Sequence, residues 1–243
     1  MARTRGGQVL TETFQNGEFN LFFTRYQIGR IVLVCLMTPS LYAAPQLESV
    51  FPLSCPVGQE TEVQPIGKSL GNVTGLIFSC PKISAQPTKG GKFLVRVAAD
   101  ATPHDCDVWC IADGQLSNPR RFVLGRNPSA VELAGNTSSE MAQPISFPGA
   151  VDGRLQAAAE IDWYQFVGQQ GDQFTLTCRS RTLDGAVEPD VALIGPGGRV
   201  LARSDGRRRE PILSLSLPAN GTYRVRISDR AYRKSDHGFY RLE

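Results

Sequence analysis

The amino-acid sequence predicts an all-β protein built from two tandem β-sandwiches. Leucines alternate with serines over residues 213–217, and Tyr223, Val225 and Ile227 alternate with polar residues after the Asn220-Gly221 dipeptide. A period of two on both sides of Asn-Gly is typical of a hairpin whose strands each bury one face. The 24 glycines and 16 prolines supply turns for many such strands, and 243 residues can hold two domains of about 100 residues each.

Composition and charge argue against two classes of protein. The chain is 41% hydrophobic and 20% charged, which is ordinary for a folded domain and too apolar for a disordered one. The net charge is +3, and four arginines against two glutamates in residues 1–43 leave only +1 for residues 44–243. We therefore expect no nucleic-acid partner.

The N-terminal segment has the layout of an export leader. The apolar run IVLVCLM follows Arg25 and Arg30 and gives way to small residues, so we predict a signal peptide cleaved after Ala43. The run is shorter than the roughly 20 residues that span a bilayer, so membrane contact is expected only through an uncleaved leader. The alternatives are a lipoprotein at Cys35 and a buried strand of the mature fold. We expect an exported protein, in the periplasm, at the cell surface or outside the cell.

Residues 45–127 have the pattern of a first sandwich. Short runs such as GLIFSCP, KFLVRVAAD and RFVLG are separated by turns rich in Gly, Pro and Asp, and no segment shows a sustained helical period. In two of these strands the alternation places one set of residues on a single face: Phe93, Val95 and Val97 in one, and Cys106, Val108 and Cys110 in the other.

Four cysteines fall in this first region: Cys55, Cys80, Cys106 and Cys110. In an oxidising compartment, four cysteines allow three pairings. Cys106 and Cys110 lie about 13 Å apart along one strand and cannot pair with each other, so we predict that each reaches across to Cys55 or Cys80. Free buried thiols are one alternative. A metal site is the other, although C-x3-C without a second close pair is a poor zinc signature.

The second half of the chain begins with a loss of pattern. Residues 128–147 gain Ser, Asn, Thr and Pro, so we predict an extended connector. The strand pattern then returns in residues 148–243. We expect one hairpin in EIDWYQFVGQQGDQFTLTCRS, a second in PDVALIGPGGRVLARSD, a third over residues 211–229, and a last strand in GFYRLE.

The order of these motifs resembles the bacterial pre-peptidase C-terminal (PPC) domain over about residues 146–242. The resemblance implies a jelly-roll-like β-sandwich of a kind found beside secreted peptidases and in large surface proteins, similar in fold to collagen- and polysaccharide-binding modules. In the first region, GKFLVRVAADATP and DVWCIADGQLSNPRRFVLG are similar to the immunoglobulin-like IPT/TIG-type domains of exported bacterial proteins, especially planctomycete-type ones. The predicted division is a leader at 1–44, an Ig-like sandwich at 45–127, a connector at 128–147 and a PPC-like sandwich at 148–243.

Asp162 and Asp190 precede strand cores at positions where the PPC pattern also has Asp. They are candidate calcium ligands, or they bond backbone amides of turns. We expect no cofactor other than calcium, whose further ligands would come from acidic residues of nearby loops: Asp172, Asp184, Glu188 and Asp205.

Basic and aromatic residues supply the candidate binding surface. A run of three arginines on a predicted loop is suited to an acidic polysaccharide or another anionic surface, or is simply solvated. Two further arginines lie on the solvent face of a neighbouring strand. Trp163 lies opposite the main apolar set of its own strand, where it could stack on a sugar ring or pack under a loop. The candidate ligand-binding residues are Trp163, Arg207, Arg208, Arg209, Arg224 and Arg226.

The sequence offers few candidates for catalysis. The zinc-protease motif H-E-x-x-H does not occur, and the chain has only two histidines, His104 and His237. We predict no catalytic residues, and assign His237 as the better of two weak candidates for a Ser-His-Asp triad. The expected function is a non-catalytic exported module that binds or spaces other components at the cell surface, with polysaccharide or extracellular protein as partner. The alternative is an accessory part or relative of a secreted peptidase or hydrolase.

Overall fold

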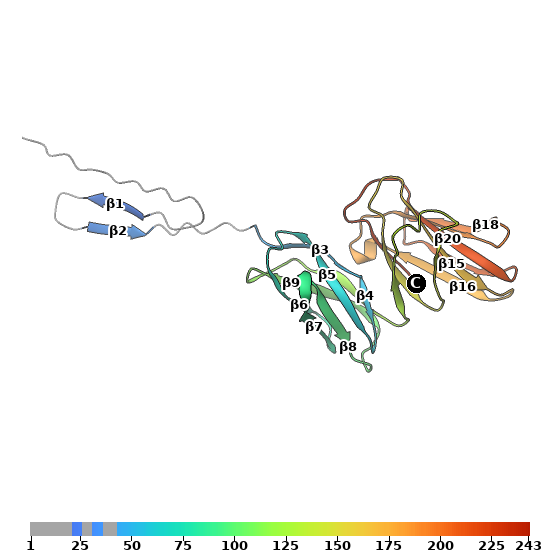
Figure 1. Ribbon diagram of the computed structural model, residues 1–243, viewed down its shortest axis with the longest axis horizontal. Coiled ribbons are helices and arrows are strands. Elements are labelled where there is room, and N and C mark those ends of the chain that lie inside the picture. The colour runs from blue at the N-terminus through green and yellow to red at the C-terminus, as the bar shows by residue number, and fades with distance from the viewer. Residues whose placement is uncertain (1–20, 26–30, 36–42) are drawn as a thin grey trace, which may run out of the picture. The chain divides into compact units, whose positions relative to one another are not determined.

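The computed structural model describes residues 21–25, 31–35 and 43–243, and this described chain is all-β, as the sequence predicts (Figure 1). It divides into two units, residues 1–43 and residues 44–243. In the first unit, β1 (Leu21–Arg25) pairs antiparallel with β2 (Ile31–Cys35), which covers the start of the predicted apolar leader. The rest of that run lies outside the described residues, and the signal peptide stays a prediction. Within the described ranges, no helix has the length and apolarity needed to cross a membrane.

The second unit begins with a sandwich of two sheets around one apolar core. One sheet contains β10 (Gln115–Leu116), β9 (His104–Ala112), β11 (Arg120–Gly125) and β4 (Ser54–Pro56) in that order, with β6 (Val73–Phe78) also paired to β9. The other contains β3 (Gln46–Phe51), β5 (Glu60–Lys68), β8 (Phe93–Val97) and β7 (Ile83–Pro87). The residues that alternation placed on one face of β8 and of β9 are all buried, as predicted.

The cysteine prediction is confirmed for one pair. Cys80 and Cys106 form a disulfide whose Cα atoms lie 5.7 Å apart. Cys55 and Cys110 are free and buried, so the second expected bridge is wrong. The Cys55 thiol instead donates to the backbone carbonyl of Gln59 at 3.3 Å, and desolvation by burial raises its pKa.

Replacing Cys80 and Cys106 together with alanine is expected to lower the free energy of unfolding by about 3 kcal/mol, because the bridge closes a loop with a sequence separation of 26 residues. Urea unfolding measures the loss. Reductant should bring the wild-type chain down to the stability of the double variant and leave the variant unchanged. A wild-type chain indifferent to reductant would contradict the bridge.

The second sandwich also has two sheets. One contains β12 (Ser129–Val131), β14 (Ala150–Arg154), β21 (Phe239–Leu242), β16 (Gln173–Arg179) and β19 (Ile212–Ser216). The other contains β13 (Gln143–Pro144), β15 (Ile161–Gly168), β20 (Gly221–Asp229), β17 (Pro189–Ile194) and β18 (Val200–Asp205). Between them, the rings of Phe166 and Phe174 stack with centroids 4.9 Å apart, and Phe147 packs edge-on against both.

Two of the three predicted hairpins are wrong. β17 and β18 pair antiparallel as expected, but β15 and β16 belong to different sheets, as do β19 and β20. Residues 169–172 and 217–220 therefore connect one sheet of the sandwich to the other. Asn220 does not close a two-residue turn, because its side-chain oxygen accepts a hydrogen bond from the backbone N–H of Gln170 at 2.7 Å, in the neighbouring crossing.

The segment expected to be an extended connector, residues 128–147, differs from that expectation. Its two ends form β12 and β13, which pair parallel with β14 and β15 and so complete both sheets of the second sandwich. Short parallel edge strands carry no alternation of their own, so the composition of this segment resembles a connector.

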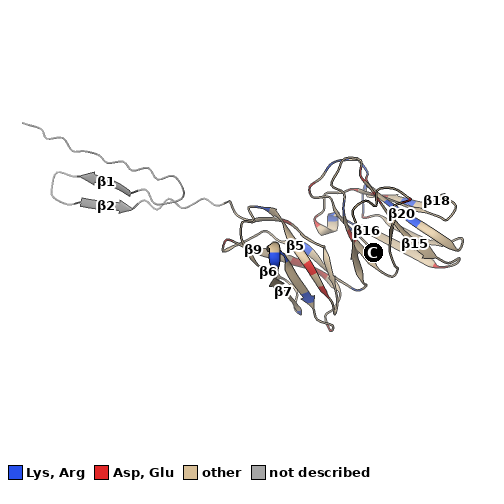
Figure 2. Ribbon diagram, in the orientation of Figure 1, with Lys and Arg blue, Asp and Glu red and all other residues tan. Residues whose placement is uncertain are grey.

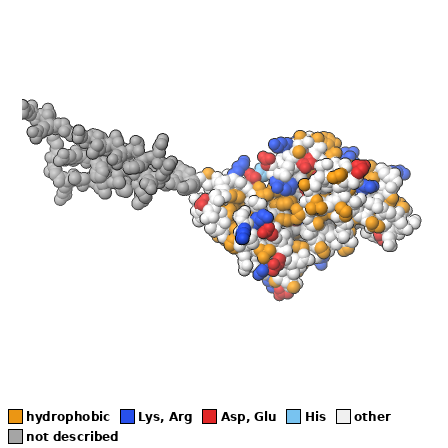
Figure 3. Space-filling model, viewed as in Figure 1, with side chains coloured by type: hydrophobic (Ala, Val, Ile, Leu, Met, Phe, Trp, Pro, Cys, Tyr) orange, Lys and Arg blue, Asp and Glu red, His pale blue; other side chains and the backbone are white. Residues whose placement is uncertain are grey.

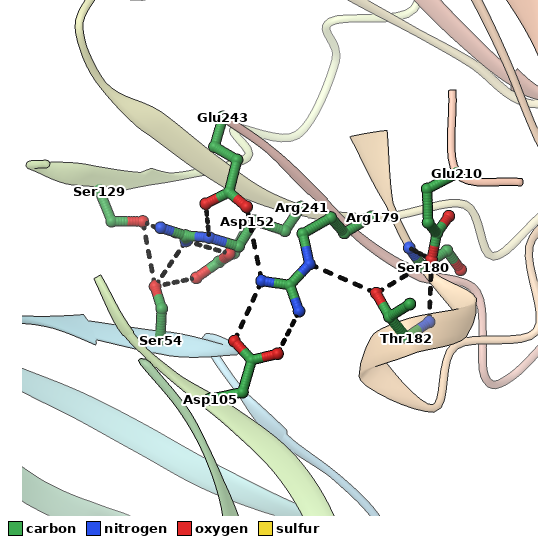
Figure 4. A network of polar contacts seen from close by, with 10 residues as sticks. All are labelled: Ser54, Asp105, Ser129, Asp152, Arg179, Ser180, Thr182, Glu210, Arg241 and Glu243. Atoms are coloured by element: carbon green, nitrogen blue, oxygen red, sulfur yellow. Dashed lines mark hydrogen bonds and ion pairs between the residues drawn. The ribbon is translucent and has the colours of Figure 1, made fainter. Parts of the chain in front are cut away.

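A buried polar cluster joins the two sandwiches (Figure 4). Arg241 of β21 is 1% exposed, and its Nη1 lies 2.7 Å from Asp152 Oδ1 on β14. The same nitrogen donates to Ser54 Oγ of the first sandwich at 2.7 Å, and that hydroxyl donates to Asp152 Oδ2 at 2.7 Å. Ser54 thus closes a triangle with an ion pair of the second sandwich.

A second ion pair and an apolar cluster extend this junction. Arg179 binds Asp105 of the first sandwich through two parallel contacts of 3.1 and 2.5 Å. Four buried residues, two from each sandwich, pack together beside it: Leu53, Val123, Leu183 and Phe239.

Candidate functional site

The outward face of the β15–β20–β17–β18 sheet carries the most complete candidate site. Register places Trp163 opposite Arg226, Arg226 opposite Ala192, and Ala192 opposite Arg203, so these four form one row across the sheet. Successive residues of a strand point to opposite faces. The adjacent residues on these strands are fully buried in the core: Tyr164 of β15, Val225 of β20 and Leu193 of β17. The row itself therefore points outward.

A second row lies beside the first. It runs from Gln165 through Arg224 and Ile194 to Val200. Together the two rows enclose a hollow of about 560 Å³. Its lining residues are Ser139, Trp163, Ala192, Ile194, Gly198, Val200, Arg203, Arg224 and Arg226. The small Ala192 side chain leaves space between larger neighbours, so an apolar floor lies between one aromatic ring and three guanidinium groups.

Charge in the hollow is unbalanced. Asp190 lies beside it on the same face of β17, two residues before Ala192, with its side chain 3% exposed, and accepts hydrogen bonds from Arg203 Nε at 2.7 Å and Arg203 Nη2 at 2.5 Å. Arg226 Nη2 approaches the same carboxylate at 3.4 Å. The bond to Asp190 raises the pKa of Arg203. Three arginines and one aspartate leave a formal charge of +2 at the hollow.

The structure brings together three of the six predicted ligand-binding residues. Trp163, Arg224 and Arg226 line the hollow. Arg207, Arg208 and Arg209 are exposed on the loop between β18 and β19 and are not among the lining residues. Figure 2 shows basic residues on β18 and β20, and on the face drawn in Figure 3 acidic and basic side chains are interspersed, as the low net charge implies.

A second candidate site is a cluster of three carboxylates. One oxygen each of Glu132, Glu160 and Asp162 lies within 4.8 Å of the other two. Asp162, at the start of β15, is fully buried and accepts a hydrogen bond from the Tyr240 hydroxyl at 2.6 Å. Its other oxygen, Oδ1, is buried with no hydrogen-bond partner among the described residues.

Burial dominates the protonation of this cluster. Desolvation, followed by the charge of Glu132, raises the pKa of Asp162 to about 8. Desolvation also raises the pKa of Glu132 to about 7. Such a cluster holds either protons or a hard cation such as calcium, which takes carboxylate oxygens as ligands. The hydrogen bond between Asp162 and Glu132 that helps to raise the pKa of Asp162 fits a shared proton, and the Asp162 oxygen that has no donor among the described residues fits a cation.

The other acidic residues predicted as calcium ligands lie elsewhere and have other partners. Asp190 binds Arg203, and Glu188 forms an ion pair with Arg230. Asp184 accepts the backbone N–H of Arg121 in the first sandwich at 2.9 Å. Asp172 accepts the N–H of Gln169 in its own turn, and Asp205 lies 3.8 Å from Arg207.

The histidines lie apart from both sites. His104 Nδ1 is 2.6 Å from the carbonyl oxygen of Thr102. His237 Nδ1 lies 3.5 Å from a carboxylate oxygen of Glu48, and Ser235 Oγ accepts the backbone N–H of His237 rather than a ring hydrogen. In the part of the chain that the structure describes, no serine hydroxyl is hydrogen-bonded to either imidazole.

Comparisons with known proteins give a limited context. No family model matches the chain. A probable subtilase-type serine protease of Deinococcus radiodurans is 27% identical over 124 residues, which cover 45% of this chain and 16% of that protein. The chain therefore spans only a small part of that relative.

The chain also has distant similarity to two solved structures of bacterial proteins. The pre-peptidase C-terminal domain of a Bacillus anthracis collagenase is 13% identical, with a TM-score of 0.29 over 49% of this chain and 96% of that one. A mixed-linkage glucan utilisation protein of Bacteroides ovatus is 10% identical, with a TM-score of 0.26 over 76% and 74%. Such low scores make no case for a shared function, so the geometry of the site has to carry the argument. The likeness of residues 45–127 to IPT/TIG-type domains stays a prediction.

Proposed function

We propose that this chain is a non-catalytic, exported module that binds polysaccharide through the hollow on the β15–β20–β17–β18 sheet. The observation that carries the proposal is the row in which Trp163 and Arg226 lie on adjacent strands beside Arg224. An aromatic ring presents a flat apolar surface to the face of a sugar, and guanidinium groups donate hydrogen bonds to its hydroxyl oxygens. The hollow combines both on a rigid sheet.

Export is supported by the cysteines. Structural disulfides persist in oxidising compartments and are rare in the cytosol. The Cys80–Cys106 bridge therefore fits an exported chain, together with the leader pattern predicted for the N-terminus. The compartment remains part of the proposal.

A second candidate function is an accessory role beside a secreted peptidase. It rests on the similarity to the Deinococcus protease, of which the matched segment is 16%. A segment of that size fits an accessory domain better than a catalytic one. The two roles are compatible, since a module that binds polysaccharide can also accompany a peptidase.

Replacing Trp163 with alanine is expected to weaken polysaccharide binding about tenfold, because the variant loses the stacking surface and the apolar contact with the sugar. Affinity electrophoresis and titration calorimetry against a panel of soluble polysaccharides measure the effect. Trp109→Ala is the matched control, because Trp109 is the other tryptophan, is also half-buried and lies on β9 of the first sandwich. Equal losses in both variants, or no binding by the wild-type chain, would refute the proposal.

We also propose that calcium, where it binds, is held by Glu132, Glu160 and Asp162. The supporting observation is the buried oxygen of Asp162 that lacks a hydrogen-bond partner. The ion would supply structural charge compensation, and the three carboxylates would bind and orient it. This role is separate from the hollow, beside which Asp190 is already paired with Arg203 and Arg226.

A further inference from the structure

We propose that the sugar held in the hollow carries a carboxylate, so that the ligand is a uronate-containing polysaccharide whose acidic group binds Arg224 and Arg226. This inference rests on the proposed polysaccharide binding and names the ligand class of the same site. It is carried by the distribution of charge, by the spacing of the two arginines, and by the position of the tryptophan relative to them.

The charge distribution leaves one guanidinium group without an anion. Asp190 is shared between Arg203 and Arg226. Arg224 Nε donates to the backbone carbonyl of Ser139 at 3.0 Å, and the described residues record no carboxylate partner for its terminal nitrogens. The other acids near the hollow, Glu140 and Asp205, are exposed to solvent. A hydrogen bond from Ser139 lowers the pKa of Glu140, and the charge of Arg224 adds a smaller lowering, but the described residues show no ion pair between the two. A positive charge that is compensated only by a solvent-screened acid favours a negatively charged ligand in the hollow.

Arg226 is also incompletely satisfied. Its Nη2 contact with Asp190 is long, at 3.4 Å, and its side chain is 28% exposed. Asp190 forms its short contacts with Arg203 instead. A second carboxylate beside Arg226 would therefore meet a guanidinium that the protein's own aspartate does not fully occupy.

The spacing of the three side chains matches a sugar ring with an acidic substituent. Arg224 and Arg226 are two residues apart on β20 and share its outward face, about 7 Å apart along the strand. Trp163 is the direct cross-strand neighbour of Arg226, at the separation at which paired side chains touch. A ring stacked on Trp163 would therefore place a carboxylate on its edge within reach of the two guanidinium groups.

The chemistry of arginine favours a carboxylate over a hydroxyl group as the recognised feature. The planar guanidinium fork matches two carboxylate oxygens, and charge-assisted hydrogen bonds are about twice as strong as neutral ones. A neutral sugar would remove water from the guanidinium groups without supplying a negative charge to replace its interaction with them. We therefore expect acidic polysaccharides to bind more tightly than neutral ones of the same backbone.

The test uses the full chain with matched ligands in titration calorimetry at low salt. Polygalacturonate is expected to bind, and its carboxyl-reduced, neutral counterpart to bind at least about tenfold more weakly, since only the charge-assisted bonds are removed. Added salt should weaken the first interaction and leave the second nearly unchanged. Dextran sulfate is the third ligand, and it should bind more weakly than polygalacturonate if the fork reads a carboxylate.

Arg224→Gln is expected to lower the affinity for polygalacturonate about tenfold or more and to remove most of the preference over the reduced polymer. Arg224→Lys keeps the charge but not the fork, and should recover only part of the affinity. Arg207→Gln is the matched control, because Arg207 is exposed on a loop outside the hollow. Thermal unfolding of each variant shows whether the sheet is intact.

The outcomes separate this inference from the function on which it rests. Equal binding of the acidic and the reduced polymer, each lost in Trp163→Ala, would overturn the carboxylate and leave polysaccharide binding standing. Tighter binding of dextran sulfate than of polygalacturonate would also overturn it, as would an Arg207→Gln loss equal to that of Arg224→Gln. A folded chain that binds none of these polymers would refute both proposals.

Discussion

Replacing Asp152 with alanine is expected to destabilise the 44–243 unit by about 3 kcal/mol, because the substitution removes the buried anion of Arg241 and leaves only the partly exposed Glu243, 3.2 Å from its Nε. Arg241 and Asp152 have side chains that are 1% and 0% exposed. Ser54 of the first sandwich loses a hydrogen-bond acceptor in the same step. The loss should appear as a lower urea midpoint, and the junction between the two sandwiches should weaken because Ser54 is one of its contacts.

Lys82→Ala is the matched control for this experiment. Lys82 and Asp100 also lie 2.7 Å apart, but their side chains are 47% and 75% exposed. An exposed pair of this kind contributes about 0–1 kcal/mol. Replacing both buried partners, as Asp152→Leu with Arg241→Met, should recover most of the lost stability, since no uncompensated charge remains. An Asp152→Ala loss as small as that of Lys82→Ala would show that water reaches the cluster.

The face of each strand could be predicted from the sequence, but the partners of each strand could not. Alternation correctly predicted that Tyr223, Val225 and Ile227 are buried, and Arg224 and Arg226 between them are half-buried on the opposite face. Alternation is a property of one strand and is the same whether the following turn stays in a sheet or crosses to the opposite one. At the crossing over 217–220, Asn220 accepts a hydrogen bond from Gln170, fifty residues away in the chain, and no local pattern contains that contact.

The candidate site shows the same division. Trp163, Arg224 and Arg226 could be found because each lies on the solvent side of a predicted strand. Arg203 also lies in a predicted strand, but it was missed because only the register between β17 and β18 places it at the hollow, opposite Ala192. The sequence instead favoured the densest run of arginines, which the structure places on a loop. A run of arginines along the chain does not predict which arginines meet on a sheet, because neighbouring side chains on a sheet come from different strands.

The carboxylate cluster was half visible from the sequence. Asp162 could be singled out by its position before a strand core, but Glu132 lies in the segment that resembles a connector, and Glu160 in a turn. Parallel pairing of β12 with β14 brings Glu132 next to Arg154, whose backbone N–H it accepts at 2.6 Å. The position of Glu132 therefore depends on β12, a short edge strand that leaves no signal in the sequence.

Stability is expected to fall as the pH rises from about 5 to about 8, because of this cluster. Asp162 and Glu132 have folded-state pKa values of about 8 and about 7, above the 3.8 and 4.5 of the unfolded chain. Over that window the folded state holds more protons than the unfolded state, so stability decreases with pH. Asp162→Asn, which keeps the acceptor for Tyr240, should flatten the decline and be more stable than the wild-type chain at pH 8. Urea unfolding at a series of pH values measures the slope.

Calcium should act against this decline, and the pH dependence of its effect distinguishes the site from a general ion effect. Protons and calcium compete for the same oxygens, so millimolar calcium should raise the urea midpoint at pH 8 and leave it unchanged at pH 5. In Asp162→Asn the calcium effect should shrink, whereas Asp113→Asn, at an exposed turn, should keep both the slope and the calcium response of the wild-type chain. If Asp162→Asn left the pH dependence of stability unchanged, the protons would be bound by other groups. If calcium raised the urea midpoint equally at both pH values, the ion would bind elsewhere, because only a cluster that ionises between pH 5 and pH 8 exchanges protons for calcium in this window.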